Sequence, residues 1–190
     1  MSYGHTQDSP MARPYAPRVT PRQSTPHMNR PWPLANSMTP LGALPTAPAC
    51  VRAHVRDTLA EWRMTSLIDT AELVASELVT NAVQASTDEH GHPIYAGGRM
   101  AVIFVRLLAE RTRLVLEVWD MAQALPAARN VSAEDETGRG LELVEAVSAN
   151  WGWKTAPDWP GKCVWAELGL LVNPDVEVTA HPDDRTRHIG

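Results

Sequence analysis

The chain has 190 residues, of which 44% are hydrophobic and 21% are charged, and its formal net charge is -5. This length suffices for one globular domain with a substantial core, while the negative charge and the lack of a basic run argue against binding nucleic acid. No segment is apolar enough for a membrane span or a secretory signal, so we expect a cytoplasmic protein.

The first 38 residues are predicted to form a disordered or loosely attached arm, because prolines recur and no apolar periodicity persists. The segment 39–44 is compatible with an edge strand. The stretch 171–190 is polar and is predicted to be a fraying tail. The domain proper is therefore expected to span residues 39–170.

Three segments, 49–62, 67–86 and 140–150, have the apolar spacing of amphipathic helices. At 100° per residue, the second has a continuous apolar arc made of Val74, Ala85, Leu78, Ala71, Ala82 and Ala75. Such an arc is typical of a helix that packs on a core.

Four segments are predicted to be strands from their apolar or alternating patterns: 99–108, 113–119, 151–155 and 162–168. The first two should form an antiparallel hairpin in the middle of a sheet. The predicted fold class is α/β, as a two-layer α+β sandwich: a mixed, mostly antiparallel sheet of about four or five strands with the helices on one face.

The two cysteines, Cys50 and Cys163, lie far apart and lack both a CxxC pattern and zinc-ligand spacing. A disulfide framework and a zinc site are therefore not expected, and we interpret both as small buried residues. His90 and His92 lie in a polar loop without further ligands nearby, so we interpret them as solvated.

Glu77 and Asn81 lie four residues apart on the second predicted helix and project from the same face. A carboxylate and a carboxamide beside a buried arc are costly unless a polar group covers them. A bound ligand is one such group. The alternative is the solvated edge of an amphipathic helix, and the helix alone does not decide between the two.

The third predicted helix is opened by Gly138, Arg139, Gly140 and Leu141. Glycines at a helix start let the backbone approach a ligand closely, and the unpaired N–H groups favour an anion. A plain turn before a helix is the alternative. The preceding segment, 121–137, has no regular apolar pattern, and so long a loop in a compact domain is usually functional or mobile.

These features occur in a fixed order: E-x-x-x-N on a helix, Asp120 at the end of a strand, and G-R-G-L opening a second helix. The combination resembles the ATP-binding domain of the GHKL superfamily, which includes DNA gyrase and the histidine kinases. The segments SELVTNAVQAS, LVLEVWD and GRGLELVEAVSANWGW are most similar to anti-sigma factor serine/threonine kinase-like proteins of actinobacteria. The resemblance covers about residues 41–168 and implies the Bergerat-type ATP-binding fold.

The resemblance implies a role for each of these residues. Asn81 matches the ligand of the Mg²⁺ that bridges the ATP phosphates, and Glu77 matches the general base. Asp120 matches the aspartate that accepts a hydrogen bond from the adenine amino group. The glycine box that holds the phosphates is matched by Gly138, Arg139, Gly140 and Leu141. The segment 121–137 is then the ATP lid.

Two elements depart from the family pattern. The usual D-x-G-x-G continues here from Asp120 as Met-Ala-Gln-Ala, so the loop beneath the adenine lacks both glycines and their backbone torsions. The late G-x-T element is read as Gly161-Lys162-Cys163, in which a thiol replaces the adenine-side hydroxyl. We therefore expect nucleotide binding to survive these changes more securely than catalysis.

The resemblance implies a serine/threonine protein kinase of anti-sigma type with ATP and Mg²⁺ as cofactors. Its partners would be a sigma factor, which it sequesters, and a STAS-type anti-anti-sigma protein, which it phosphorylates. The alternative is a non-catalytic, nucleotide-gated protein-binding module, which the missing glycines favour. A histidine kinase would need a helical dimerisation element that the proline-rich arm cannot supply. The sequence leaves open whether the protein forms a homodimer.

Overall fold

The computed structural model describes residues 22–23, 32–96, 98–123, 140–156 and 159–169. Most of the predicted arm, the predicted lid beyond Gln123 and the C-terminal tail lie outside the described residues. Gly138 and Arg139 also lie outside them, so the structure tests only the second half of the G-R-G-L motif.

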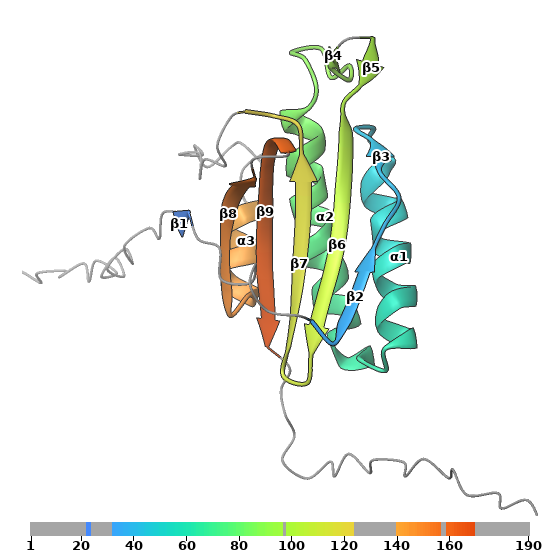
Figure 1. Cartoon of the computed structure of the whole chain (residues 1–190), viewed down its shortest axis with the longest axis vertical. Helices are drawn as coiled ribbons and strands as arrows, with labels where there is room; N and C mark the ends of the chain where they lie inside the picture. Colours follow the sequence, from blue (N-terminus) through green and yellow to red (C-terminus); the bar gives the residue numbers. More distant parts are fainter. Residues whose placement is uncertain (1–21, 24–31, 97, 124–139, 157–158, 170–190) are drawn as a thin grey trace, which may run out of the picture.

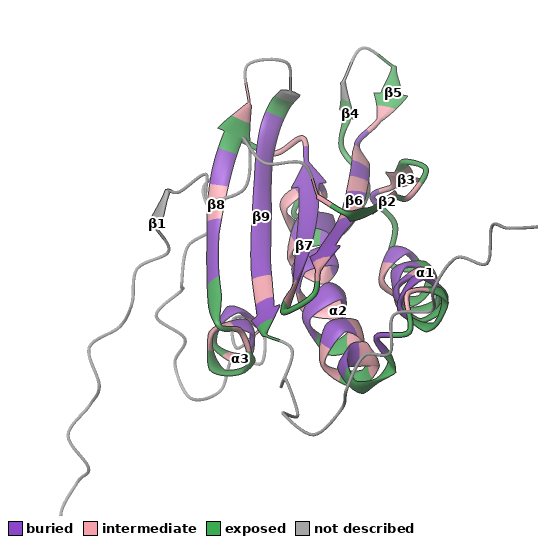
Figure 2. Ribbon diagram, turned by 60° about the horizontal axis from the view of Figure 1, so that its bottom comes forward, coloured by how far each residue is buried: buried purple, intermediate pink, exposed green. Residues whose placement is uncertain are grey.

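In the described part of the chain, three α-helices lie on one face of a sheet (Figure 1). They are α1 (Ala47–Glu61), α2 (Ile68–Ala85) and α3 (Gly140–Val147), and a short 3-10 helix, η1 (Thr65–Leu67), precedes α2. Figure 2 shows all three on the same side of the strands. None of these helices combines the length and hydrophobicity that crossing a membrane requires.

The described strands form a seven-stranded sheet in the order β1-β8-β9-β7-β6-β2, with β3 also paired to β6. Their bounds are β1 (Arg22–Gln23), β2 (Leu34–Ser37), β3 (Leu41–Gly42), β6 (Val102–Glu110), β7 (Arg113–Asp120), β8 (Asn150–Ala156) and β9 (Trp159–Gly169). The β1–β8 pair is parallel and the other pairs are antiparallel, so the sheet is mixed. A separate small hairpin joins β4 (Tyr95–Ala96) to β5 (Arg99–Met100). The predicted fold class is confirmed.

Short strands account for the differences from the predicted sheet. Strand β2 lies within the segment that we expected to be an arm, and it pairs with β6, Leu34 opposite Ala109. Four residues are too few for alternation to stand out in a sequence. The predicted strand 99–108 is interrupted at Ala101, whose N–H donates to the Ile94 carbonyl, and α3 ends at Val147, before the predicted 150.

The predicted apolar arc of α2 is confirmed as the face that packs on the sheet. Its buried members are Ala71, Val74, Ala75, Leu78 and Ala82, while Ala85 at the helix end is half-buried. They share one core with inward-facing residues of β7 such as Leu116 and Val118. Burying one such Val or Leu side chain stabilises the fold by about 1.5–3 kcal/mol, so this contact fixes where α2 lies.

A second buried cluster lies on the opposite face of the sheet, since side chains alternate along each strand. It consists of Leu108, Val115, Trp119, Cys163 and Trp165, with Trp32 packed against it. Glu117 lies on this face too and pairs with Lys154 and with Arg106, whose Nη2 is 2.6 Å from Glu117 Oε2. Cys163 is buried as predicted, whereas Cys50 is exposed, so the prediction for Cys50 is wrong.

Candidate functional site

The carboxylate of Glu77 and the carboxamide of Asn81 lie beside the first residue of α3. Both side chains are half-buried on α2. A Cβ added at Gly140 would overlap Glu77 Oε2 and would lie 3.6 Å from Asn81 Nδ2. The structure therefore brings Glu77, Asn81 and Gly140 together from two segments far apart in the sequence.

Gly140 allows this approach because it has no side chain. The start of α3 can then lie directly against α2, and the first N–H groups of a helix have no partner within that helix. Leu141, the next residue, is 8% exposed and belongs to the main core, where it anchors α3. Of the predicted glycine box, the described residues thus provide one backbone approach at Gly140 and one packing side chain at Leu141.

Asn81 has an unsatisfied polar atom at this contact. Its Nδ2 is buried and has no hydrogen-bond partner within the described residues, which costs about 1–3 kcal/mol. A carboxamide oxygen is a suitable hard ligand for Mg²⁺, the N–H₂ group of Asn81 can donate to a phosphate oxygen, and the first N–H groups of a helix favour an anion. The residues present therefore fit a magnesium–nucleotide complex: Asn81 would hold the metal and the N–H groups of α3 the phosphates.

Asp120 lies at the end of β7 and is only 1% exposed. Its Oδ1 accepts hydrogen bonds from Lys162 Nζ at 2.9 Å and from the backbone N–H of Ala122 at 2.8 Å. Burial raises the pKa of Asp120, and the Lys162 ammonium and the Ala122 N–H oppose that shift. The pair thus places a positive charge against the carboxylate expected to recognise adenine.

Lys162, and not Cys163, is the residue of β9 that reaches Asp120. Cys163 packs with Trp119 and Trp165 on the sheet face opposite the helices. The prediction that the Cys163 thiol replaces the adenine-side hydroxyl is therefore wrong, because neighbouring residues of a strand point to opposite faces. The sequence did hold a signal for Lys162: it is a lysine directly before the apolar run 163–166.

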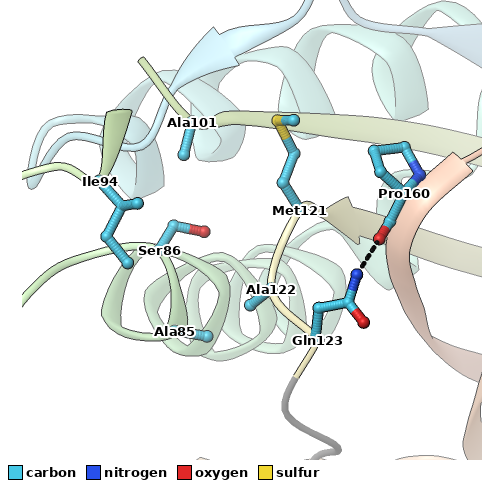
Figure 3. Close-up of a pocket in the computed structure, with 8 residues that line it drawn as sticks. All are labelled: Ala85, Ser86, Ile94, Ala101, Met121, Ala122, Gln123 and Pro160. Atoms are coloured by element: carbon cyan, nitrogen blue, oxygen red, sulfur yellow. Dashed lines mark hydrogen bonds between the residues drawn. The ribbon is translucent and has the colours of Figure 1, made fainter. Parts of the chain in front are cut away.

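A cavity of about 260 Å³ lies between the end of α2, the segment after Asp120 and the start of β9 (Figure 3). Its lining consists of Ala85, Ser86, Ile94, Ala101, Met121, Ala122, Gln123 and Pro160. Ligand pockets measure roughly 300–1,000 Å³, so this cavity is slightly smaller than that range. Gln123 Nε2 donates to the Pro160 carbonyl at 3.0 Å and links two sides of the cavity.

Ser86 is the polar group that this mostly apolar cavity leaves unsatisfied. The residue is 2% exposed, and its Oγ has no hydrogen-bond partner in the part of the chain that the structure describes. In Figure 3 this oxygen is directed toward Met121 across the cavity. A flat, mostly apolar ring with one hydrogen-bonding atom would complement such a lining.

The cavity is lined by residues that lie close in the sequence to Asn81 and Asp120. Ser86 follows Asn81 by little more than one helical turn, and Met121 directly follows Asp120. Glu77, Asn81 and Asp120 do not themselves line the cavity. Among the described residues, Gly140, Glu77 and Asn81 therefore form one group and Asp120 with Lys162 forms another, while the cavity lies between the end of α2 and the segment after β7.

Comparison with known proteins identifies the family. No curated protein matches the chain. The family model for the histidine kinase-like ATPase domain matches residues 43–168, which is more than half of the chain and includes Glu77, Asn81, Asp120 and Gly140. Domains of this family bind ATP. The chain belongs to the family of histidine kinase-like ATPase domains.

Proposed function

We propose that this ATP-binding regulatory protein is an anti-sigma-type serine/threonine kinase that transfers the γ-phosphoryl group of ATP to a STAS-type antagonist. When the antagonist is absent, it would sequester a sigma factor. The observation that carries the nucleotide site is the contact of Gly140 with Glu77 and Asn81. It brings a carboxylate, a carboxamide and a helix start together, and these groups would supply a general base, a metal ligand and anion-binding N–H groups to a metal-bound triphosphate.

Each residue has one task in this proposal. When bound, Mg²⁺ neutralises charge on the phosphates. Asn81 would hold that ion, and the N–H groups at Gly140 would orient the phosphate chain. Glu77 would accept the proton of the attacking serine or threonine hydroxyl. The cavity around Ser86 would hold the adenine ring, and Asp120 would lie behind the cavity wall.

A non-catalytic, nucleotide-gated binding module is the second candidate. The ion pair of Asp120 with Lys162 favours the binding module, because a carboxylate already paired with an ammonium accepts a hydrogen bond from the adenine amino group less strongly. The loop after Asp120 also lacks the two glycines of the family pattern. This candidate would bind ATP, change its affinity for partners and leave the nucleotide intact.

Phosphoryl transfer to the antagonist is expected to depend on Glu77. With labelled ATP, Mg²⁺ and a STAS-type protein, Glu77→Gln should lower the transfer rate by about tenfold or more, because an amide cannot accept the proton. ATP affinity should stay within about threefold, since the shape of the side chain is kept. The matched control is Glu61→Gln, at the exposed end of α1. If transfer is undetectable in wild type while ATP binds, the binding module replaces the kinase.

Gly140→Ala is expected to weaken ATP binding by roughly tenfold, the equivalent of about 1.4 kcal/mol. The added Cβ would overlap the Glu77 carboxylate, so that side chain or the start of α3 must move. Isothermal titration calorimetry measures the effect. Gly169→Ala is the matched control, because no atom lies within 4 Å of a Cβ there. Equal affinities of Gly140→Ala and wild type would show that the α3 start does not contact nucleotide.

A further inference from the structure

Lys162 and Asp120 form a buried ion pair behind one wall of the cavity. Their exposed fractions are 5% and 1%, and Lys162 Nζ lies 2.9 Å from Asp120 Oδ1. The ammonium also donates to the Ala122 carbonyl at 3.4 Å. Met121 and Pro160 line the cavity, so its lining begins one residue after Asp120 and ends two residues before Lys162.

Two buried charges of this kind stabilise each other. Moving either side chain out of the pair would leave the other charge buried and unpaired, which is strongly destabilising. The neighbouring glycine strengthens the restraint: a Cβ at Gly161 would overlap the backbone of Asp120 and Met121, so β9 lies directly against the end of β7. Lys162 is thus fixed against Asp120 by its charge and by the strand that carries it.

The ion pair makes Asp120 a weaker hydrogen-bond acceptor for a nucleobase. An amino group of adenine is a neutral donor, whereas Lys162 is a charged donor, and hydrogen bonds from charged donors are roughly twice as strong. Asp120 Oδ1 also accepts from the Ala122 N–H. Both donors bind Oδ1, so an adenine amino group would approach a carboxylate whose charge the Lys162 ammonium already balances.

We propose that Lys162 is a specificity-determining residue that prevents Asp120 from selecting the adenine amino group. The base site then accepts purine nucleoside triphosphates with or without an amino group at C6. This inference rests on the proposed nucleotide site. It assigns the purine ring to the apolar cavity beside Ser86 and assigns no selectivity to Asp120 while Lys162 is present.

The test compares ATP with purine riboside triphosphate, which lacks the amino group, by calorimetry in the presence of Mg²⁺. Wild type should bind both with affinities within about threefold. In Lys162→Thr, which removes the ammonium and leaves a small hydroxyl, ATP should bind at least about tenfold more tightly than the analogue, as one recovered hydrogen bond to a carboxylate predicts. Lys162→Arg keeps the positive charge and should behave as wild type.

The outcomes separate this inference from the proposed function. A preference of tenfold or more for ATP in wild type overturns the inference, even if Lys162→Thr does not fold. An unchanged ratio in a folded Lys162→Thr, verified by its circular dichroism, also overturns it. If wild type and Lys162→Thr both fail to bind either nucleotide, the proposed nucleotide site fails and the inference fails with it.

Discussion

Gly161→Ala is expected to lower the free energy of unfolding by about 3 kcal/mol, which for a domain of this size is a fall in Tm of roughly 10 °C. A Cβ at Gly161 would overlap the Asp120 carbonyl oxygen and would lie 2.7 Å from Met121 Cα. Both atoms belong to the backbone of β7 or to the residue that follows it. Backbone atoms in a paired strand cannot move aside as the end of a flexible side chain can.

Gly169→Ala at the other end of the same strand is the matched control for this prediction. An added Cβ meets nothing within 4 Å there, so the free energy of unfolding should change by less than about 0.5 kcal/mol. Urea denaturation followed by circular dichroism compares the two variants with wild type. If Gly161→Ala is as stable as Gly169→Ala, the close approach of β9 to the end of β7 is not present in solution.

The elements that the sequence predicted best have patterns visible within one segment. The arc of α2 and the hairpin of β6 with β7 each repeat an apolar position often enough to reveal their period. Glu77 and Asn81 were found for the same reason, since a spacing of four on a helix already places them on one face.

The features that escaped prediction depend on contacts between distant segments. Nothing in four residues indicates that β2 pairs with β6, because the partner lies about seventy residues away. Matching letters to a family pattern assigned the Cys163 thiol to the adenine side of the site. Only the alternation of β9 against β7 shows that Lys162 faces Asp120 and that Cys163 faces Trp119 and Trp165.

The cavity was also beyond prediction from the sequence. Its lining comes from the end of α2, the segment before β4, Ala101 just before β6, the residues after β7 and the start of β9. The sequence does not mark Ser86 as a binding residue, because a serine at a helix end is an ordinary cap or turn residue. Its significance comes from burial without a partner, which only coordinates reveal.

Asn81→Ala is expected to weaken the binding of ATP in the presence of Mg²⁺ by roughly a hundredfold. The variant removes the proposed metal ligand and the hydrogen-bonding group of a carboxamide, and interactions with charged groups are worth about 1.5–3 kcal/mol each. Without Mg²⁺ the loss should be small. The matched control is Gln84→Ala, an exposed amide on the same helix, which should retain wild-type affinity.

The most direct test of the nucleotide site is therefore a calorimetric titration of wild type and Asn81→Ala with ATP, each with and without Mg²⁺. With Asn81 as the metal ligand, Mg²⁺ should tighten binding to wild type by nearly the roughly hundredfold that the variant loses, and should leave the variant unchanged. Equal tightening in both proteins, or no effect of Mg²⁺ on wild type, would contradict the assignment of Asn81 as the metal ligand.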